Sequence, residues 1–299
     1  MFMLKINNLH KKFGNKMVLN GLNLSVPEHS IFGFIGKNGA GKTTTMKMII
    51  GMLKADAGEI IVNGEKVCYG QTSTNKYIGY LPDVPEFYSF MTAEEYLNYC
   101  ADIVGMTKEE GINRSKELLH LVGLDGEKHK IKGFSRGMKQ RLGIAQALLN
   151  KPKLLICDET TSALDPVGRR EILDILLSVK ENTTVLFSTH ILSDIEQICT
   201  DVAFLNNGVV SVQGKLEDVK KKYRREEYQI LTDNNQGLEI LKSSFSNLNI
   251  IGRNQLSFCQ SDYKLADVLR FVADNNIAVL KIERVEPSLE SLFMEVVEK

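Results

Sequence analysis

The chain has 299 residues, a length that suggests two domains, and its 37 Lys plus Arg balance 37 Asp plus Glu, so we expect no nucleic-acid partner. Its longest apolar stretches, such as 48–53, are far shorter than the ~20 residues that a membrane-spanning helix needs. The start of the chain lacks the apolar core of a signal peptide and the five cysteines show no paired spacing, so we expect a cytosolic protein without disulfides or a zinc site.

Up to about residue 214, short β-rich runs alternate with helical patterns, which predicts an α/β domain built on a largely parallel sheet. Between residues 88 and 150 the pattern is helical, with Thr92 predicted to cap a helix that begins near Ala93. We therefore expect a helical subdomain, about 88–150, inserted into a sheet domain that covers 1–220. The strands that we expect are 30–35, 153–157, 183–188 and 201–205, and a helix is expected over 44–53.

A basic run at 220–225 follows, and it is either a nucleic-acid or lipid patch or a solvated helix end that leads into a linker. Glu226 and Glu227 beside it favour the helix end. From Tyr228 the pattern reads strand, helix, hairpin, helix, strand, which predicts a small α+β, ferredoxin-like domain over 228–299. Its predicted elements are the helices 236–245 and 265–274, a hairpin turn near 252–254 and a last strand at 278–283.

Residues 36–43 match the pattern G-x-x-x-x-G-K-[ST] between an expected strand and an expected helix. Glycines let backbone N–H groups close around phosphate oxygens, and the helix N-terminus adds positive potential. In this pattern Lys42 reaches the β and γ phosphates and Thr43 can hold magnesium. A glycine-rich turn could match by chance, but the strand before it and the helix after it favour a site for ATP and Mg²⁺.

The apolar run 154–157 ends in two acids, Asp158 and Glu159. In an open α/β sheet, ligands bind at the carboxyl ends of the strands, so both carboxylates should lie near the phosphate loop. Asp158 suits the magnesium shell. Glu159 suits a general base, or a group that positions the attacking water.

With these motifs in place, the chain resembles the nucleotide-binding subunits of ABC transporters over roughly residues 1–220. Five further short segments follow in the order found in that family. Each of them alone could have an ordinary structural role, such as that of a core aromatic or a surface histidine. The segments are Phe13 at the place of the aromatic that stacks on adenine, 80–83 at the Q-loop, 134–141 similar to the signature Leu-Ser-Gly-Gly-Gln, 162–165 at the D-loop and 188–190 at the switch histidine.

The resemblance implies a P-loop NTPase domain of the ABC ATPase type, ATP hydrolysis, and a separate membrane-spanning permease subunit as partner at the inner face of the cell membrane. It also implies an isologous homodimer, in which the signature of one copy completes the ATP site of the other. In this reading Glu159 and His190 are catalytic, and Thr43, Asp83 and Asp158 are metal ligands. The ATP-binding residues that it implies are Phe13, Val18, Gly36, Asn38, Gly39, Ala40, Gly41, Lys42, Thr43, Thr44, Ser135, Gly137 and Asp165.

The chain departs from the family pattern at three places. In the signature, Phe134, Arg136 and Met138 replace Leu, Gly and Gln, a form that resembles antibiotic-resistance and type-two exporter subunits. Asp83 replaces the usual glutamine of the Q-loop. Thr160 replaces a nearly universal proline, which frees the backbone beside Glu159 and adds an N–H donor.

Two further features bear on function. The segment 286–293 matches the closing pattern of an accessory domain found on many type-two exporter ATPases, which favours export over import. The aromatic run 87–91 either forms a docking surface for the membrane partner or only packs against the helical subdomain.

Three other classes of protein are alternatives to this reading. A ribosome-associated factor would carry two ATPase halves where this chain has one, and a DNA-repair ATPase would carry a long heptad segment. A nucleotide-binding regulator without turnover remains open because of Asp83 and Thr160.

Overall fold

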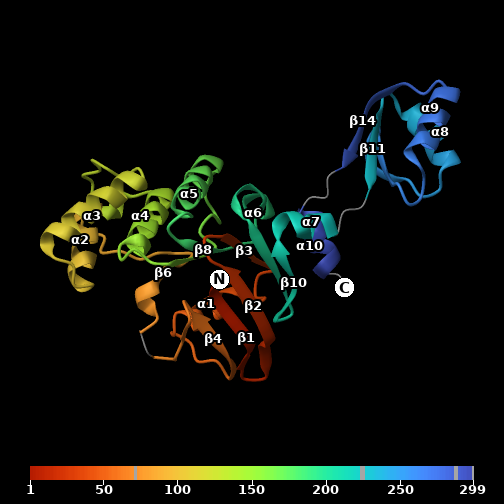
Figure 1. The fold of residues 1–299 in the computed structure, drawn as a ribbon. Coiled ribbons are helices and arrows are strands. Elements are labelled where there is room, and N and C mark those ends of the chain that lie inside the picture. Colours follow the sequence, from red (N-terminus) through yellow and green to blue (C-terminus); the bar gives the residue numbers. More distant parts are fainter. Residues whose placement is uncertain (71–72, 223–225, 286–288, 298–299) are drawn as a thin grey trace. The chain divides into compact units, whose positions relative to one another are not determined.

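A computed structural model describes the chain except for residues 71–72, 223–225, 286–288 and 298–299. The chain divides into two compact units (Figure 1). The first comprises Met1–Val219 together with the described residues from Val296 on, and the second comprises Lys220–Glu295. Among the described residues, no helix combines the length and the apolar character that crossing a membrane requires.

The central sheet of the first unit has six strands in the order β10-β9-β3-β8-β7-β6. All neighbours pair in parallel except β10 and β9. Strands β3, β8 and β7 are buried along their whole length, as expected where both faces of a parallel sheet are covered. The four predicted strands are confirmed to within one residue at each end. The strands are β3 Ile31–Gly36, β6 Ile78–Leu81, β7 Leu154–Asp158, β8 Thr184–Thr189, β9 Asp201–Asn206 and β10 Val209–Lys215.

A second sheet of the first unit is antiparallel, in the order β2-β1-β4-β5, and the sequence patterns did not predict it. Its strands β1 and β2 form a hairpin of two twelve-residue strands whose pairing is interrupted by several register shifts. Each shift reverses which side chains face inward, so the alternation that marks a strand is broken. The strands are β1 Phe2–Phe13, β2 Lys16–Pro27, β4 Ala57–Val62 and β5 Glu65–Lys66.

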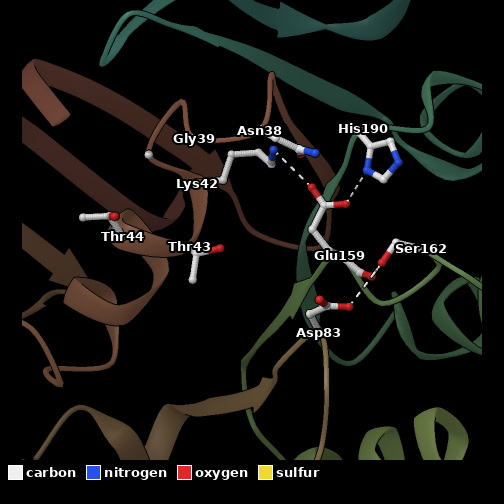
Figure 2. A pocket seen from close by; sticks show the side chains of 10 residues that line it. Asn38, Gly39, Lys42, Thr43, Thr44, Asp83, Glu159, Ser162 and His190 are labelled. Carbon is white, nitrogen blue, oxygen red and sulfur yellow. Dashed lines mark hydrogen bonds and ion pairs between the residues drawn. The ribbon is translucent and has the colours of Figure 1, made fainter. Parts of the chain in front are cut away.

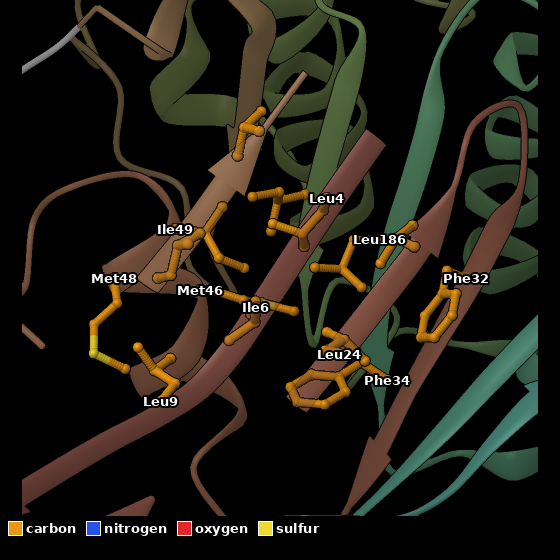
Figure 3. Packing of buried hydrophobic residues seen from close by; sticks show 14 of the residues in the cluster. Leu4, Ile6, Leu9, Leu24, Phe32, Phe34, Met46, Met48, Ile49 and Leu186 are labelled. Atoms are coloured by element: carbon orange, nitrogen blue, oxygen red, sulfur yellow. The ribbon is translucent and has the colours of Figure 1, made fainter. Parts of the chain in front are cut away.

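One hydrophobic cluster joins the two sheets of the first unit through helix α1, Lys42–Ile49 (Figure 3). Leu4 and Ile6 from β1 meet Met46 and Ile49 from α1, and Leu186 lies on the central sheet. Since α1 follows the phosphate loop directly, this burial holds the loop against both sheets.

Helix α1 ends at Ile49, four residues before the predicted end of this helix at residue 53. Gly51 has φ 73°, its N–H donates to the carbonyl of Met48, and the N–H of Met52 donates to the carbonyl of Lys47. This pair of bonds is the Schellman motif, which closes a helix at a left-handed glycine.

The predicted helical subdomain contains three α-helices. Thr92 caps α2, as predicted, and it forms a capping box with Glu95; Thr107 and Glu110 form another on α3. The helices of this subdomain are α2 Ala93–Ile103, α3 Lys108–Leu121 and α4 Arg136–Leu148. The next helices along the chain are α5 Pro166–Val179, α6 Leu192–Ile198 and α7 Leu216–Lys222.

The second unit has an antiparallel sheet in the order β12-β13-β11-β14 with its own hydrophobic core. The strand and helix order that predicted a ferredoxin-like domain is confirmed. Residues 223–225 of the basic run and residues 286–288 of the closing pattern lie outside the described residues. The elements are β11 Glu227–Thr232, α8 Asn235–Ser244, β12 Asn249–Gly252, β13 Gln255–Cys259, α9 Leu265–Asp274, β14 Val279–Val285 and α10 Leu289–Val297.

Candidate functional site

The phosphate loop connects β3 to α1 and surrounds the side chain of Lys42. Lys42 Nζ donates to the carbonyl oxygens of Gly36, at 2.7 Å, and Lys37, at 3.4 Å. Gly41 precedes the helix with φ 111°, and a Cβ there would lie 2.7 Å from Leu19 Cδ2, so the position requires glycine. The loop therefore presents the N-terminus of α1, with its free N–H groups, to any anion beside it.

A pocket of about 390 Å³ opens beside this loop (Figure 2). It brings together segments that follow β3, β6, β7 and β8, all at the carboxyl ends of central strands. Nine predicted site residues and Ser162 line it. The lining residues are Asn38, Gly39, Gly41, Lys42, Thr43, Thr44, Asp83, Glu159, Ser162 and His190.

Glu159 is the centre of the charged contacts in the pocket. Its Oε1 lies 3.1 Å from Lys42 Nζ, and its Oε2 lies 2.7 Å from His190 Nδ1 (Figure 2). The side chains of Lys42 and Glu159 are only 6% and 15% exposed, so each needs the other to balance its charge. A phosphate anion entering the pocket would compete with Glu159 for Lys42.

The backbone of Glu159 has φ 52°, a left-handed conformation that is costly for a residue with a side chain. Its N–H donates to the carbonyl oxygen of Ser188 at 3.0 Å, and its own carbonyl accepts from Ser162 Oγ at 2.6 Å. Thr160, next in the chain, is fully buried. Strain of this kind costs ~1–3 kcal/mol and persists only where the surroundings hold it, which they do here at both ends of the residue.

Oxygen atoms suited to magnesium lie on both sides of the pocket. Thr43 is exposed in the pocket wall, whereas Asp158 is 2% exposed and its Oδ1 accepts from Ser188 Oγ at 2.8 Å. Asp83 Oδ1 accepts from Arg136 Nη2 at 3.3 Å and from Ser162 Oγ at 3.2 Å.

No cluster of three or more His, Cys, Asp or Glu side chains among the described residues could hold a metal ion. These hard oxygen donors fit an ion that arrives with substrate phosphates and keeps several waters, as Mg²⁺ does.

The other predicted site residues do not line this pocket. Phe13 is half exposed at the end of β1, and Val18 on β2 lies against the phosphate loop, 3.3 Å from where a Cβ on Gly41 would be. Ser135 caps α4 and Asp165 caps α5. The predicted residues outside the pocket lining are Phe13, Val18, Gly36, Ala40, Ser135, Gly137, Asp158 and Asp165.

Two residues of this region were not among the predicted site residues. Ser162 belongs to the D-loop motif, and that motif was the signal that could have identified it. Asp194, in the first turn of α6, is 2% exposed, and burial raises the pKa of its carboxyl, partly offset by a hydrogen bond from the Thr161 side chain and by the charge of Arg169. No sequence pattern distinguishes Asp194 from other helix acids.

Two protein families match the chain. The family described as ABC transporter matches residues 19–162, and the family described as ATP-binding protein DrrA1-3-like, C-terminal domain, matches residues 214–297. The second match covers the whole of the second unit.

Curated proteins and solved structures give the same picture. The uncharacterized ABC transporter ATP-binding protein YxlF of Bacillus subtilis is 44% identical over 220 residues, which is 73% of each chain. The bacitracin transport ATP-binding protein BcrA of Bacillus licheniformis is 36% identical over 300 residues, 98% of this chain and 97% of its own. A solved ATP binding subunit of an ABC transporter, 32% identical, superposes with a TM-score of 0.67 over 74% of this chain and 93% of its own.

Proposed function

This chain belongs to the family of ABC transporter ATP-binding proteins, and from that premise we propose that it drives an export cycle at the inner face of the cell membrane. It binds and hydrolyses ATP and powers transport through a separate membrane partner. The proposal adds the direction of transport, the arrangement of two copies around two ATP sites, and the role of each residue in the pocket.

Export is the direction that the closing pattern at 286–293 favours, and the relatives that match both units support a role in transport. The bacitracin transport protein aligns over 98% of this chain, and the DrrA1-3-like family covers 214–297. The membrane partner selects the transported molecule, and bacitracin is the first substrate to test.

The observation that carries the mechanism is the contact of Glu159 with both Lys42 and His190. We assign Lys42 to the β and γ phosphates, Glu159 to general-base catalysis on the attacking water, and His190 to holding Glu159 and sensing the γ-phosphate. When the γ-phosphate takes over Lys42, Oε1 of Glu159 becomes free to accept a proton from water. The water is thus activated only when ATP is bound.

Magnesium bound with ATP neutralises phosphate charge and orients the leaving group. Thr43 and Asp83 offer oxygens in the pocket lining, and Asp158 is buried at the end of β7. We assign these three residues to the Mg²⁺ shell, with Asp83 released from Arg136 and Ser162 when ATP binds.

A homodimer would complete the site. Ser135, Gly137 and Asp165 were predicted to handle nucleotide, yet they do not line the pocket of their own copy. Two copies related by a two-fold axis would supply these residues to each other's ATP.

The membrane partner would dock on the aromatic cluster formed by Phe87, Tyr88 and Phe90 with Tyr96 and Tyr99 of α2. Tyr88 packs edge-on against Tyr99 and Tyr96, with centroids 5.6 and 6.3 Å apart, so the cluster seats the helical subdomain. Tyr88 and Phe90 nevertheless stay 48% and 66% exposed, which leaves an apolar surface for a partner.

Glu159→Gln tests the mechanism. We expect ATP binding to persist while turnover falls by ~10²–10⁴, the usual contribution of a general base. The variant should also form a dimer in ATP that gel filtration detects. Glu109→Gln, which changes an exposed glutamate of α3, is the matched control and should hydrolyse ATP like the wild type.

Each part of the proposal can fail separately. Wild-type turnover in Glu159→Gln would remove Glu159 from the mechanism, and a monomer in saturating ATP would count against the homodimer. We also assign all nucleotide handling to 1–220, so deleting 228–299 should leave the dissociation constant for ATP unchanged. Loss of binding by a folded truncated protein would contradict that division.

A further inference from the structure

The ring of Phe13 has a cation over it. Phe13 ends β1, where it pairs with Lys16 across the hairpin, and it is 49% exposed. Lys11, two residues earlier on the same strand, places its Nζ 5.2 Å from the centroid of the Phe13 ring. One part of the ring surface is therefore occupied by an ammonium group, while the ring as a whole stays half open to solvent.

Lys11 is held in this position by Asp56, which precedes β4. Lys11 Nζ donates to Asp56 Oδ1 at 2.9 Å, and the Lys11 side chain is only 10% exposed. Asp56 is fixed in turn, because its Oδ2 accepts from the backbone N–H of Lys12 at 2.6 Å and its own N–H donates to the carbonyl of His10 at 3.0 Å. The hydrogen bond from Lys11 lowers the pKa of Asp56, so the carboxylate keeps its charge. The ammonium cannot swing away as an ordinary surface lysine can.

The hairpin that carries Phe13 adjoins the phosphate loop. Val18 and Leu19 of β2 lie so close to Gly41 that a Cβ there would be 3.3 Å from Val18 Cγ1 and 2.7 Å from Leu19 Cδ2. Gly41 is also a lining residue of the phosphate pocket. A group bound by its phosphates at this loop can therefore extend along the hairpin.

We propose that Lys11, held by Asp56, is a positioning residue for the base of the nucleotide. Its ammonium group fixes the orientation of the Phe13 ring from one face and leaves the other face free to stack on adenine. The inference rests on the proposed function, in which Phe13 receives the base. A cation over one face of an aromatic ring is attracted by the π electrons and orients the ring. A ring already oriented loses less freedom when the base stacks on it, so the base binds more tightly.

A comparison of two ligands tests this role. ATP carries the base, whereas inorganic tripolyphosphate carries only the phosphates, and the dissociation constants of both can be measured by calorimetry. Lys11→Met removes the cation and keeps an unbranched apolar side chain. We expect ATP to bind about two- to fivefold more weakly to Lys11→Met while tripolyphosphate binding stays the same. Lys11→Arg, which keeps a cation over the ring, should restore ATP binding.

Lys12→Met is the matched control, because Lys12 is exposed and donates to Asp56 through its backbone N–H, which the substitution keeps. It should bind both ligands like the wild type. A purely structural role of Lys11 would weaken ATP and tripolyphosphate equally, and a thermal melt of each variant would show the accompanying loss of stability. Equal weakening, or no change for ATP, would overturn the inference.

Phe13→Leu separates this inference from the proposed function. If Phe13→Leu weakens ATP but not tripolyphosphate, and Lys11→Met adds nothing in that background, the two residues act as one unit. If Phe13→Leu weakens ATP while Lys11→Met alone does not, only the role of Lys11 is wrong. If Phe13→Leu leaves ATP binding unchanged, the base does not stack on Phe13 and the assignment of that residue fails.

Discussion

Replacing Thr160 by proline tests how the backbone holds Glu159. Thr160 and Thr161 are the central residues of a turn that the Ser162 N–H closes on the Glu159 carbonyl at 3.1 Å. Proline suits the first central position of such a turn because its φ is fixed near −65°. The conflict lies one residue earlier, since proline favours an extended backbone before it and Glu159 has φ 52°.

Three effects set the size of the change in stability. Proline lowers the entropy of the unfolded chain, a gain of ~0.4–1 kcal/mol. It also removes Thr160 Oγ1, a buried hydroxyl with no hydrogen-bond partner among the described residues, which is a further gain. Against these, the clash of the proline ring with a left-handed Glu159 before it adds new strain, of the ~1–3 kcal/mol that a disfavoured backbone conformation usually costs.

Thr160→Val isolates the backbone effect, because valine removes the same hydroxyl and leaves φ free. The difference between the two variants then contains only the entropy gain and the strain. We expect Thr160→Pro to be less stable than Thr160→Val by ~1–2 kcal/mol, which lowers the melting temperature by about 2–8 °C in a domain of this size. Calorimetric melts of both variants measure it.

The same backbone strain at Glu159 should also lower the rate of ATP turnover. If Glu159 relaxes toward an extended backbone, its carboxylate moves away from Lys42 and His190, and a loss of ~1.4 kcal/mol in positioning reduces turnover tenfold. Steady-state ATPase assays at saturating Mg–ATP would detect this. A Thr160→Pro protein that melts at or above Thr160→Val and turns over like the wild type would refute the argument.

Three further outcomes are expected. Because burial raises the pKa of Asp194, the folded state holds its proton more tightly than the unfolded state, so this carboxyl lowers stability as pH rises. Asp194→Asn should therefore raise the melting temperature at about pH 8, with a smaller gain at about pH 4, and equal gains would contradict this. Gly41→Ala should weaken ATP binding and cost ~1–3 kcal/mol through φ 111° and its clash, more than Gly105→Ala, which has φ 79° but open space around it. Phe90→Ser should reduce co-purification with the membrane partner but not ATPase activity, whereas Tyr69→Ser, an exposed aromatic elsewhere, should change neither.

The elements that the sequence predicted best are those whose pattern is local. The buried strands of the central sheet are short apolar runs, and the helices of the subdomain start at polar caps such as Thr92. The second unit was predicted for the same reason, since its helices and its hairpin turn each carry their own signal. None of these elements depends on a distant residue for its identity.

The β1–β2 hairpin was missed because tertiary contacts override its local pattern. Its register shifts, and a left-handed residue at Asn8, break the two-residue period by which a strand is recognised. The same holds for Glu159, which has a positive φ although it is not a glycine and two β-branched residues, Thr160 and Thr161, follow it. Backbone strain of this kind is held by contacts with Ser188 and Ser162, so no local pattern reports it.

The charged centre of the pocket follows from sheet order rather than from any single motif. Lys42 follows β3, Glu159 follows β7 and His190 follows β8, and β8 lies between the other two strands in the sheet. Parallel strands end at one edge, so three residues far apart in the chain meet there. Glu159 balances the charge of Lys42 in the pocket, so the group that we propose for phosphate binding and the group that we propose for activating water are coupled by one ion pair of 3.1 Å. That coupling would make hydrolysis depend on correct phosphate binding.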